Sequence, residues 1–145
     1  MIKQFQDLSW RERELLYKAP ALLSVLVSCS ENEVNETHKN AAIKLAHLRT
    51  FTADGILLPY YHQVEKTFKT AFEDAITTYA PFDATKRDEL KKEISKVNDV
   101  IGKLEPAYGQ ALRKSLEGYA MHVKRSDSNV FSGVIFPLSW AGMNN

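Results

Sequence analysis

The sequence predicts an all-α fold, a compact bundle of five to six helices that forms a single domain over residues 1–145. Apolar residues recur at steps of three and four along most of the chain, which is the period of helices with one buried face. Proline, glycine or short polar stretches separate these runs. A chain of 145 residues can bury roughly 68–70% of its unfolded surface, so it needs no disulfide or metal ion to fold.

The first predicted helix begins at Ser9, which has capping-box spacing with Glu12. Pro20 interrupts the apolar run that follows, and it removes the helical hydrogen bond to the carbonyl of Leu16. The apolar phase nevertheless continues beyond Pro20 to Leu26. The sequence therefore predicts a kink, or a break between two short helices, with the same face turned inward.

The second predicted helix covers residues 36–51, with Asn35 as its N-cap. Its small and apolar residues lie on nearly every side: Ala41, Ala42, Ile43, Leu45, Ala46 and Leu48. A helix that is apolar all round is normally surrounded by other helices. We therefore expect a central buried helix at about 35–51.

Three further helices follow. Pro59 suits the first position of a third helix, and Pro81 ends it. The spacing of Thr85 and Asp88 predicts the start of a fourth helix, and Pro106 lies near the start of a fifth. No segment shows the bounded alternation that is typical of a β-sheet.

Residues 126–145 lose the helical period and form an irregular apolar tail. Its large apolar residues are Val130, Phe131, Val134, Ile135, Phe136, Leu138 and Trp140. Such a group must be covered. We expect the tail to pack on the bundle, or to contact a partner protein or a second copy of the chain.

Composition favours a cytoplasmic protein. Nineteen basic and eighteen acidic residues leave a formal charge of +1, which predicts no nucleic-acid partner and no binding to a charged membrane surface. The single cysteine, Cys29, excludes an internal disulfide framework and fits a reducing compartment. No secretory signal is recognisable, and no apolar run approaches the ~20 residues of a membrane span.

The loop between the first two helices concentrates groups that could hold a ligand. Glu31, Glu33 and Glu36 lie beside Asn32 and Asn35, and such oxygen ligands suit a hard cation such as calcium or magnesium. The spacing departs from that of an EF-hand. In the alternative interpretation, Asn32 adopts a left-handed turn while Glu33 and Glu36 complement the N-terminus of the second helix.

This loop resembles the tellurite-resistance TerB-like family, small all-helical proteins with the hallmark Ala-Asp-Gly-x-Ile and an acidic residue four positions later. Ser30, Glu31, Asn32 and Val34 stand for the Ala, Asp, Gly and Ile of that motif, and His38 stands for the later acidic residue. The likeness covers roughly residues 15–51. Glu31 is longer than the aspartate, and His38 replaces a carboxylate.

The resemblance implies both a fold and a site. The family is thought to bind metal through its acidic residues and to act in stress-response complexes. By this likeness we expect a TerB-like fold and a divalent metal ion held by Glu31, Glu33 and His38.

Other reactive residues have simpler interpretations. Ala53-Asp54-Gly55-Ile56 superficially repeats the hallmark, but it lies between helices, where a turn with Gly55 at positive φ accounts for it. We expect His47, which lies among apolar residues, to be a hydrogen-bonded core histidine. Cys29 falls at a helix end whose dipole disfavours a thiolate, so we expect a small buried residue there.

The sequence therefore favours a non-enzymatic cytoplasmic protein of TerB-like type, a binding or stress-response module with a metal site at the 31–38 loop. The alternative is a protein–protein adaptor or homo-oligomerising module without any ligand, which acts through the tail at 126–145. A third interpretation is a small-molecule hydrolase or transferase with a pocket around His47.

Overall fold

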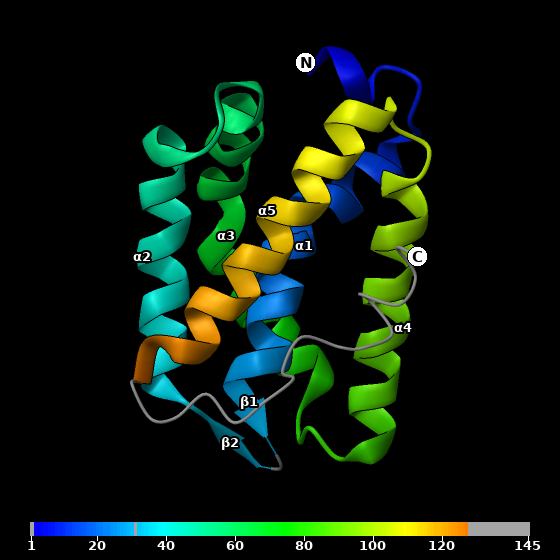
Figure 1. The fold of residues 1–145 in the computed structure, drawn as a ribbon. Helices are drawn as coiled ribbons and strands as arrows, with labels where there is room; N and C mark the ends of the chain where they lie inside the picture. Colours follow the sequence, from blue (N-terminus) through cyan, green and yellow to red (C-terminus); the bar gives the residue numbers. More distant parts are fainter. Residues whose placement is uncertain (1, 31, 128–145) are drawn as a thin grey trace.

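The computed structural model describes residues 2–30 and 32–127, and within them it confirms the all-α bundle (Figure 1). The five α-helices are α1 (Trp10–Ser28), α2 (Glu36–Thr52), α3 (Leu58–Tyr79), α4 (Ala84–Ile101) and α5 (Pro106–Lys124). Three short 3₁₀ helices are η1 (Lys3–Phe5), η2 (Gly55–Leu57) and η3 (Arg125–Asp127). None of the described helices is both long and apolar enough to cross a membrane.

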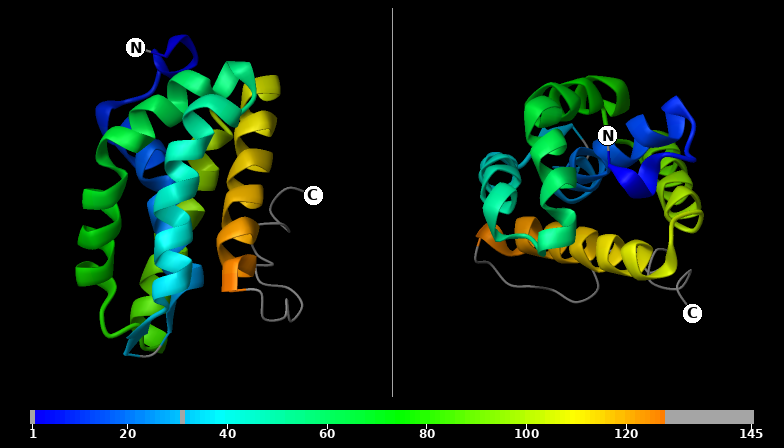
Figure 2. Two further views of the ribbon diagram at one scale, coloured as in Figure 1. Left: turned by 90° about the vertical axis from the view of Figure 1, so that its left-hand side faces the viewer. Right: turned by 90° about the horizontal axis from the view of Figure 1, so that it is seen from above.

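The central helix is α1, so the prediction that residues 35–51 form the buried centre is wrong. Ten residues of α1 are buried, including every residue from 19 to 26, whereas α2 buries four. Figure 2 shows α1 inside a ring formed by the other four helices, each of which packs against it. On the outer flank of α2, Leu48 and Phe51 are 43% and 63% exposed.

Side-chain size explains this arrangement. Three of the apolar residues of α2 are alanines, which remove little area from water when they are buried, and Leu48 and Phe51 lie on its outer flank. Residues 19–27 of α1 are instead rich in leucine and valine. Burying this segment on all sides removes far more apolar surface from water, so α1 takes the centre.

Pro20 lies inside a continuous α1, so the predicted break into two short helices does not occur. The Tyr60 hydroxyl of α3 donates a 2.6 Å hydrogen bond to the Leu16 carbonyl. The Ser24 hydroxyl donates to the carbonyl of Pro20 at 2.7 Å. Side-chain hydroxyl groups thus hydrogen-bond to the Leu16 carbonyl, before the proline, and to the carbonyl of Pro20 itself.

Most helix starts agree with the sequence analysis. Ser9 forms the capping box with Glu12, and the Asn35 side chain accepts a hydrogen bond from the backbone N–H of His38. At α4, however, the N-cap is Asp83. Thr85 lies within the helix, so the predicted start there is wrong. Asp83 is itself a favoured N-cap residue, and its carboxylate accepts from the backbone N–H of Lys86 at 2.9 Å.

The loop between α1 and α2 is a two-stranded antiparallel hairpin, β1 (Cys29–Ser30) and β2 (Glu33–Val34), which the sequence analysis missed. Asn32 adopts the predicted left-handed conformation, with φ of 62°. At the other turn, Gly55 starts η2 and does not have positive φ, so that detail was wrong. The predicted tail lies outside the described residues beyond position 127.

Candidate functional site

The hairpin that joins α1 to α2 carries the residues predicted to bind metal. Its backbone is fixed at several points. The Asn35 N–H donates to the Ser28 carbonyl at 2.6 Å, and the Asn32 N–H donates to the Pro81 carbonyl at 2.8 Å. From α4, the Arg87 guanidinium donates to the Cys29 carbonyl at 3.0 Å. These contacts tie the hairpin to the rest of the bundle.

His38 lies in the first turn of α2 and is buried, with 4% of its surface exposed. Its ring atom Nδ1 lies 3.1 Å from the carbonyl oxygen of Val27. Because a carbonyl oxygen can only accept, Nδ1 carries the proton of this hydrogen bond. In the neutral ring, Nε2 therefore keeps its lone pair.

Of the three predicted ligands, the structure describes His38 and Glu33, which both lie at the hairpin end of the bundle. Glu33 is exposed on β2, and Glu31 lies outside the described residues. Within residues 2–30 and 32–127, no three His, Cys, Asp or Glu residues are grouped closely enough to hold a metal ion. A site with three such ligands at the hairpin therefore requires Glu31.

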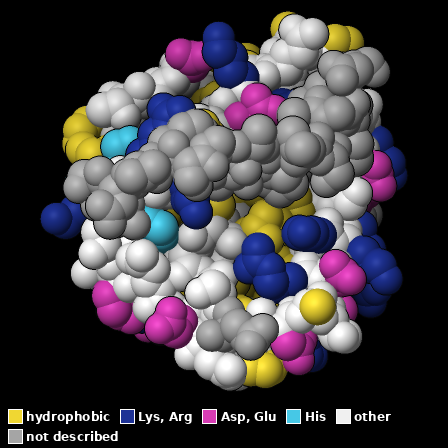
Figure 3. Space-filling view, turned by 60° about the horizontal axis from the view of Figure 1, so that its bottom comes forward, with side chains coloured by type: hydrophobic (Ala, Val, Ile, Leu, Met, Phe, Trp, Pro, Cys, Tyr) yellow, Lys and Arg dark blue, Asp and Glu magenta, His cyan; other side chains and the backbone are white. Residues whose placement is uncertain are grey.

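Charged groups of both signs surround the hairpin end. Figure 3 shows carboxylate and basic side chains interspersed over this part of the surface, around a central group of hydrophobic side chains. Neither sign dominates, as the formal charge of +1 suggests.

Cys29 is buried, as predicted, and its thiol is a poor nucleophile. Burial raises the pKa of the thiol to about 11, despite the opposing charges of Arg87 and Lys39. A thiol with this pKa is protonated near neutral pH, and the thiolate is the reactive form. Cys29 therefore acts as a small apolar residue at the end of α1.

His47 does not lie in the core, so that prediction is wrong. Its side chain is 66% exposed on the outer flank of α2, and its ring atom Nδ1 forms a hydrogen bond with the Glu65 carboxylate of α3. The apolar neighbours of His47 are not all in the core either, because Ala46 is buried while Leu48 is exposed. His47 lines neither of the pockets described next.

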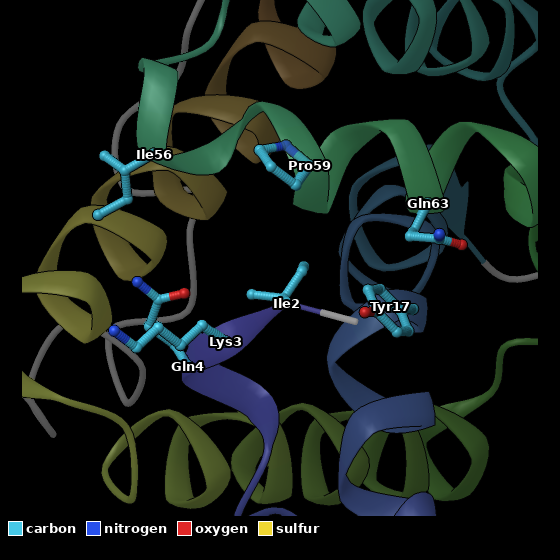
Figure 4. Close-up of a pocket in the computed structure, with 7 residues that line it drawn as sticks. All are labelled: Ile2, Lys3, Gln4, Tyr17, Ile56, Pro59 and Gln63. Atoms are coloured by element: carbon cyan, nitrogen blue, oxygen red, sulfur yellow. The ribbon is translucent and has the colours of Figure 1, made fainter.

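A pocket of about 310 Å³ lies at the opposite end of the bundle (Figure 4). Parts of the chain that are distant in sequence form it: η1 with the residue before it, α1, η2 and the first turns of α3. Its lining residues are Ile2, Lys3, Gln4, Tyr17, Ile56, Pro59 and Gln63. A second pocket of about 330 Å³ shares Tyr17 and Gln63 and continues along α1 and α3.

Tyr17 is held between these two pockets by other aromatic rings. Its ring stacks on Tyr60 with centroids 5.9 Å apart, and it lies 5.6 Å from the ring of Phe5. Partial burial raises the pKa of Tyr17, with Arg13 opposing this shift and Glu14 adding to it. The Arg13 guanidinium also donates to the Leu8 carbonyl at 2.9 Å, which anchors the N-terminal segment.

Sequence reasoning missed this pocket because no local motif marks it. The chain matches no protein-family model, and searches of curated proteins and of solved structures gave no match.

Proposed function

We propose that this protein is a non-enzymatic binding module of TerB-like type, and that its hairpin end binds a divalent metal ion through Glu31, Glu33 and His38. The main support is the hydrogen bond from His38 Nδ1 to the Val27 carbonyl. Histidines that ligate metals commonly donate their second ring N–H to a carbonyl or carboxylate, which fixes the ring and leaves the other nitrogen for the metal. Because α2 is not the central helix, the arrangement of the bundle does not support the TerB-like resemblance. The resemblance depends only on the sequence pattern of residues 30–38.

The state of the reactive side chains favours binding over catalysis. The pKa of the buried Cys29 thiol is about 11. Burial also raises the pKa values of Tyr60 and Tyr119 well above the ordinary value for tyrosine. His47, which the enzyme interpretation would require, lies on the outer surface beside Glu65 and lines neither pocket. The Cys29 thiol and the Tyr60 and Tyr119 phenols are therefore protonated near neutral pH, and the protonated forms are poor nucleophiles.

Thermal unfolding in the presence of metal tests the proposal. Ligands that bind only the folded state raise the melting temperature. We expect calcium, magnesium or zinc to do so for the wild-type protein, and the double variant Glu31→Gln, Glu33→Gln to lose the effect. Glu36→Gln is the matched control, since Glu36 is also exposed near the hairpin but outside the proposed ligand set. Equal melting temperatures with and without each metal would refute metal binding.

A second candidate is an adaptor that associates with another copy of itself. Leu48 and Phe51 of α2 and Ile56 of η2 are large hydrophobic residues exposed towards the same end of the bundle. Grouped exposed apolar residues often mark protein contacts. Sedimentation velocity would reveal a dimer whose dissociation constant rises in Phe51→Ser. A monomer at every concentration would exclude self-association.

A further inference from the structure

The described part of the chain ends at the hairpin end of the bundle, where a long uncharged segment begins. After α5, η3 packs against both α2 and α5, and Figure 1 shows this end of the chain beside the first turn of α2. Residues 128–145 contain no charged side chain, and they include the seven large apolar residues of the predicted tail. A segment of this composition gains free energy when an apolar surface covers it.

At the hairpin end, α4 and α5 lie further apart than at the loop that joins them. In the halves next to that loop, Arg113 of α5 donates a 2.9 Å hydrogen bond to Asn98 of α4. At the hairpin end, the first turn of α4 lies beside β1, where Arg87 donates to the Cys29 carbonyl. The end of α5 instead continues into η3 beside α2. The last turn of α1 therefore lies between two helix ends that diverge, as Figure 1 shows.

Hydrophobic side chains are partly exposed at this end. They include Val27 in the last turn of α1, Val34 of β2 and Met121 of α5. Figure 3 shows a group of hydrophobic side chains in the middle of this face, with charged side chains around it. We call this surface, formed by Val27, Val34, Met121 and the adjoining sides of α4 and α5, the hairpin-end face. It offers apolar cover next to the point where the tail begins.

Chain connectivity limits which surface the start of the tail can use. An extended chain advances at most about 3.6 Å per residue, so Val130 and Phe131 lie within about 14 Å of Asp127. Phe51 lies at the other end of α2, and about 22 Å of helix separates it from Glu36 in the first turn. The first apolar residues of the tail therefore cannot reach the exposed hydrophobic residues around Phe51, and they need cover at the hairpin end.

We propose that residues 128–145 fold back on their own chain and dock on the hairpin-end face, between the diverging ends of α4 and α5. Val130 and Phe131 pack next to the end of α5, and the later apolar residues continue over α1 towards α4. The tail is uncharged, so its docking buries no unpaired charged side chain of its own. Attachment within one chain also gives a high effective concentration, of mM order for short flexible linkers. This inference does not depend on metal binding at the hairpin.

Tryptophan fluorescence tests whether the tail is covered. The chain has two tryptophans, and Trp10→Phe removes the one that is 67% exposed on α1. Docking predicts that Trp140 emits at shorter wavelength than in a free peptide of residues 128–145, with severalfold weaker acrylamide quenching at every protein concentration. Phe131→Ser should raise the quenching towards that of the peptide, and the matched variant Asn129→Ser should not. Emission and quenching equal to those of the peptide would overturn docking.

A nitroxide spin label on the tail tests where it docks. Ser139→Cys in a Cys29→Ala background provides one labelling site, since Cys29 is the single cysteine of the chain. Docking predicts that the label broadens the amide signals of Val27, Arg87 and Met121, and that reduction of the nitroxide restores them.

The same label separates the other occupants and surfaces. Broadening at Leu48 and Phe51 instead would overturn the assignment to the hairpin-end face. In a mixture, spin-labelled chains without isotope are combined with isotope-labelled chains that carry no spin label. Broadening in that mixture would assign the tail to a second copy and overturn docking within one chain. No broadening outside the tail in either sample would overturn docking altogether.

Discussion

The Tyr60 hydroxyl donates a 2.6 Å hydrogen bond to the Leu16 carbonyl, the group that Pro20 leaves without its helical partner. A proline has no N–H to donate to the carbonyl four residues earlier. Tyr60 is fully buried, so its hydroxyl also needs a partner within the protein. The one hydrogen bond thus gives a partner both to the Leu16 carbonyl and to the buried Tyr60 hydroxyl, and α1 continues through its proline at the centre of the bundle.

Tyr60→Phe should lower the free energy of unfolding by about 1–3 kcal/mol, because it leaves the buried Leu16 carbonyl without a partner. The loss should be smaller in a Pro20→Ala background, where the restored N–H can serve that carbonyl. Urea denaturation of the wild type, both single variants and the double variant measures the coupling between the two sites. Equal losses in both backgrounds would show that the proline and the hydroxyl act independently.

Arg49 should stabilise the junction of α2, α3 and α5. Its guanidinium donates to the Tyr61 hydroxyl at 3.1 Å and to the Ser115 carbonyl at 3.0 Å. It also lies 5.5 Å from the ring centres of Tyr61 and Tyr119. We expect Arg49→Lys to reduce stability by about 1–3 kcal/mol, since an ammonium cannot reproduce the planar fork of donors. The matched control Lys44→Arg, on the exposed flank of α2, should change stability by less than about 0.5 kcal/mol.

Stability should fall at alkaline pH, and Cys29 should contribute to the fall. The folded state raises the pKa of this thiol from 9.0 to about 11. The unfolded chain therefore releases the proton first, and the stabilisation is present below pH 9 and is lost as the pH rises toward 11. The loss due to this one group is at most about 1.4 kcal/mol per pH unit.

Cys29→Ala isolates this contribution. Its unfolding free energy should decline less steeply than that of the wild type between pH 9 and pH 11. Chemical denaturation at several pH values measures both slopes. Buried tyrosines, whose pKa values are also raised, remain in both proteins and add the same decline above about pH 10. Identical slopes would contradict the burial of the thiol.

His47 should matter little to stability. Its contact with Glu65 joins two exposed side chains, and even fully charged exposed pairs contribute only about 0–1 kcal/mol. We expect His47→Ala to lower the free energy of unfolding by less than about 1 kcal/mol. A loss of several kcal/mol in thermal or urea unfolding would mean that His47 belongs to the core after all.

Local chemistry allowed much of the fold to be predicted. Ser9 and Asn35 are caps whose side-chain oxygens serve orphan backbone N–H groups, and Pro106 fits the first turn of α5. These signals act within a few residues. The central position of α1 could not be read from the same signals, because it depends on how much apolar area each helix offers to its neighbours. The hydrogen bond between Tyr60 and Leu16 likewise joins residues that are distant in sequence.

The hairpin end and the pocket beside η1 also differ in how far the sequence could predict them. The hairpin end was predicted because Glu33 and His38 lie close together in the sequence, although the strands themselves were missed. The pocket beside η1 was not predicted. Ile2, Tyr17 and Gln63 come from three separate segments, and only the packing of η1 and α3 around α1 brings them together. A tyrosine on a helix face carries no sign of such a pocket by itself.

The most direct test of the proposed function is a crystal structure of the protein grown with zinc and measured at the zinc absorption edge. The proposal predicts one anomalous peak at the hairpin, at about 2.0–2.2 Å from His38 Nε2 and from carboxylate oxygens of Glu31 and Glu33. Density without such a peak, with His38 Nε2 hydrogen-bonded to a protein atom, would contradict it.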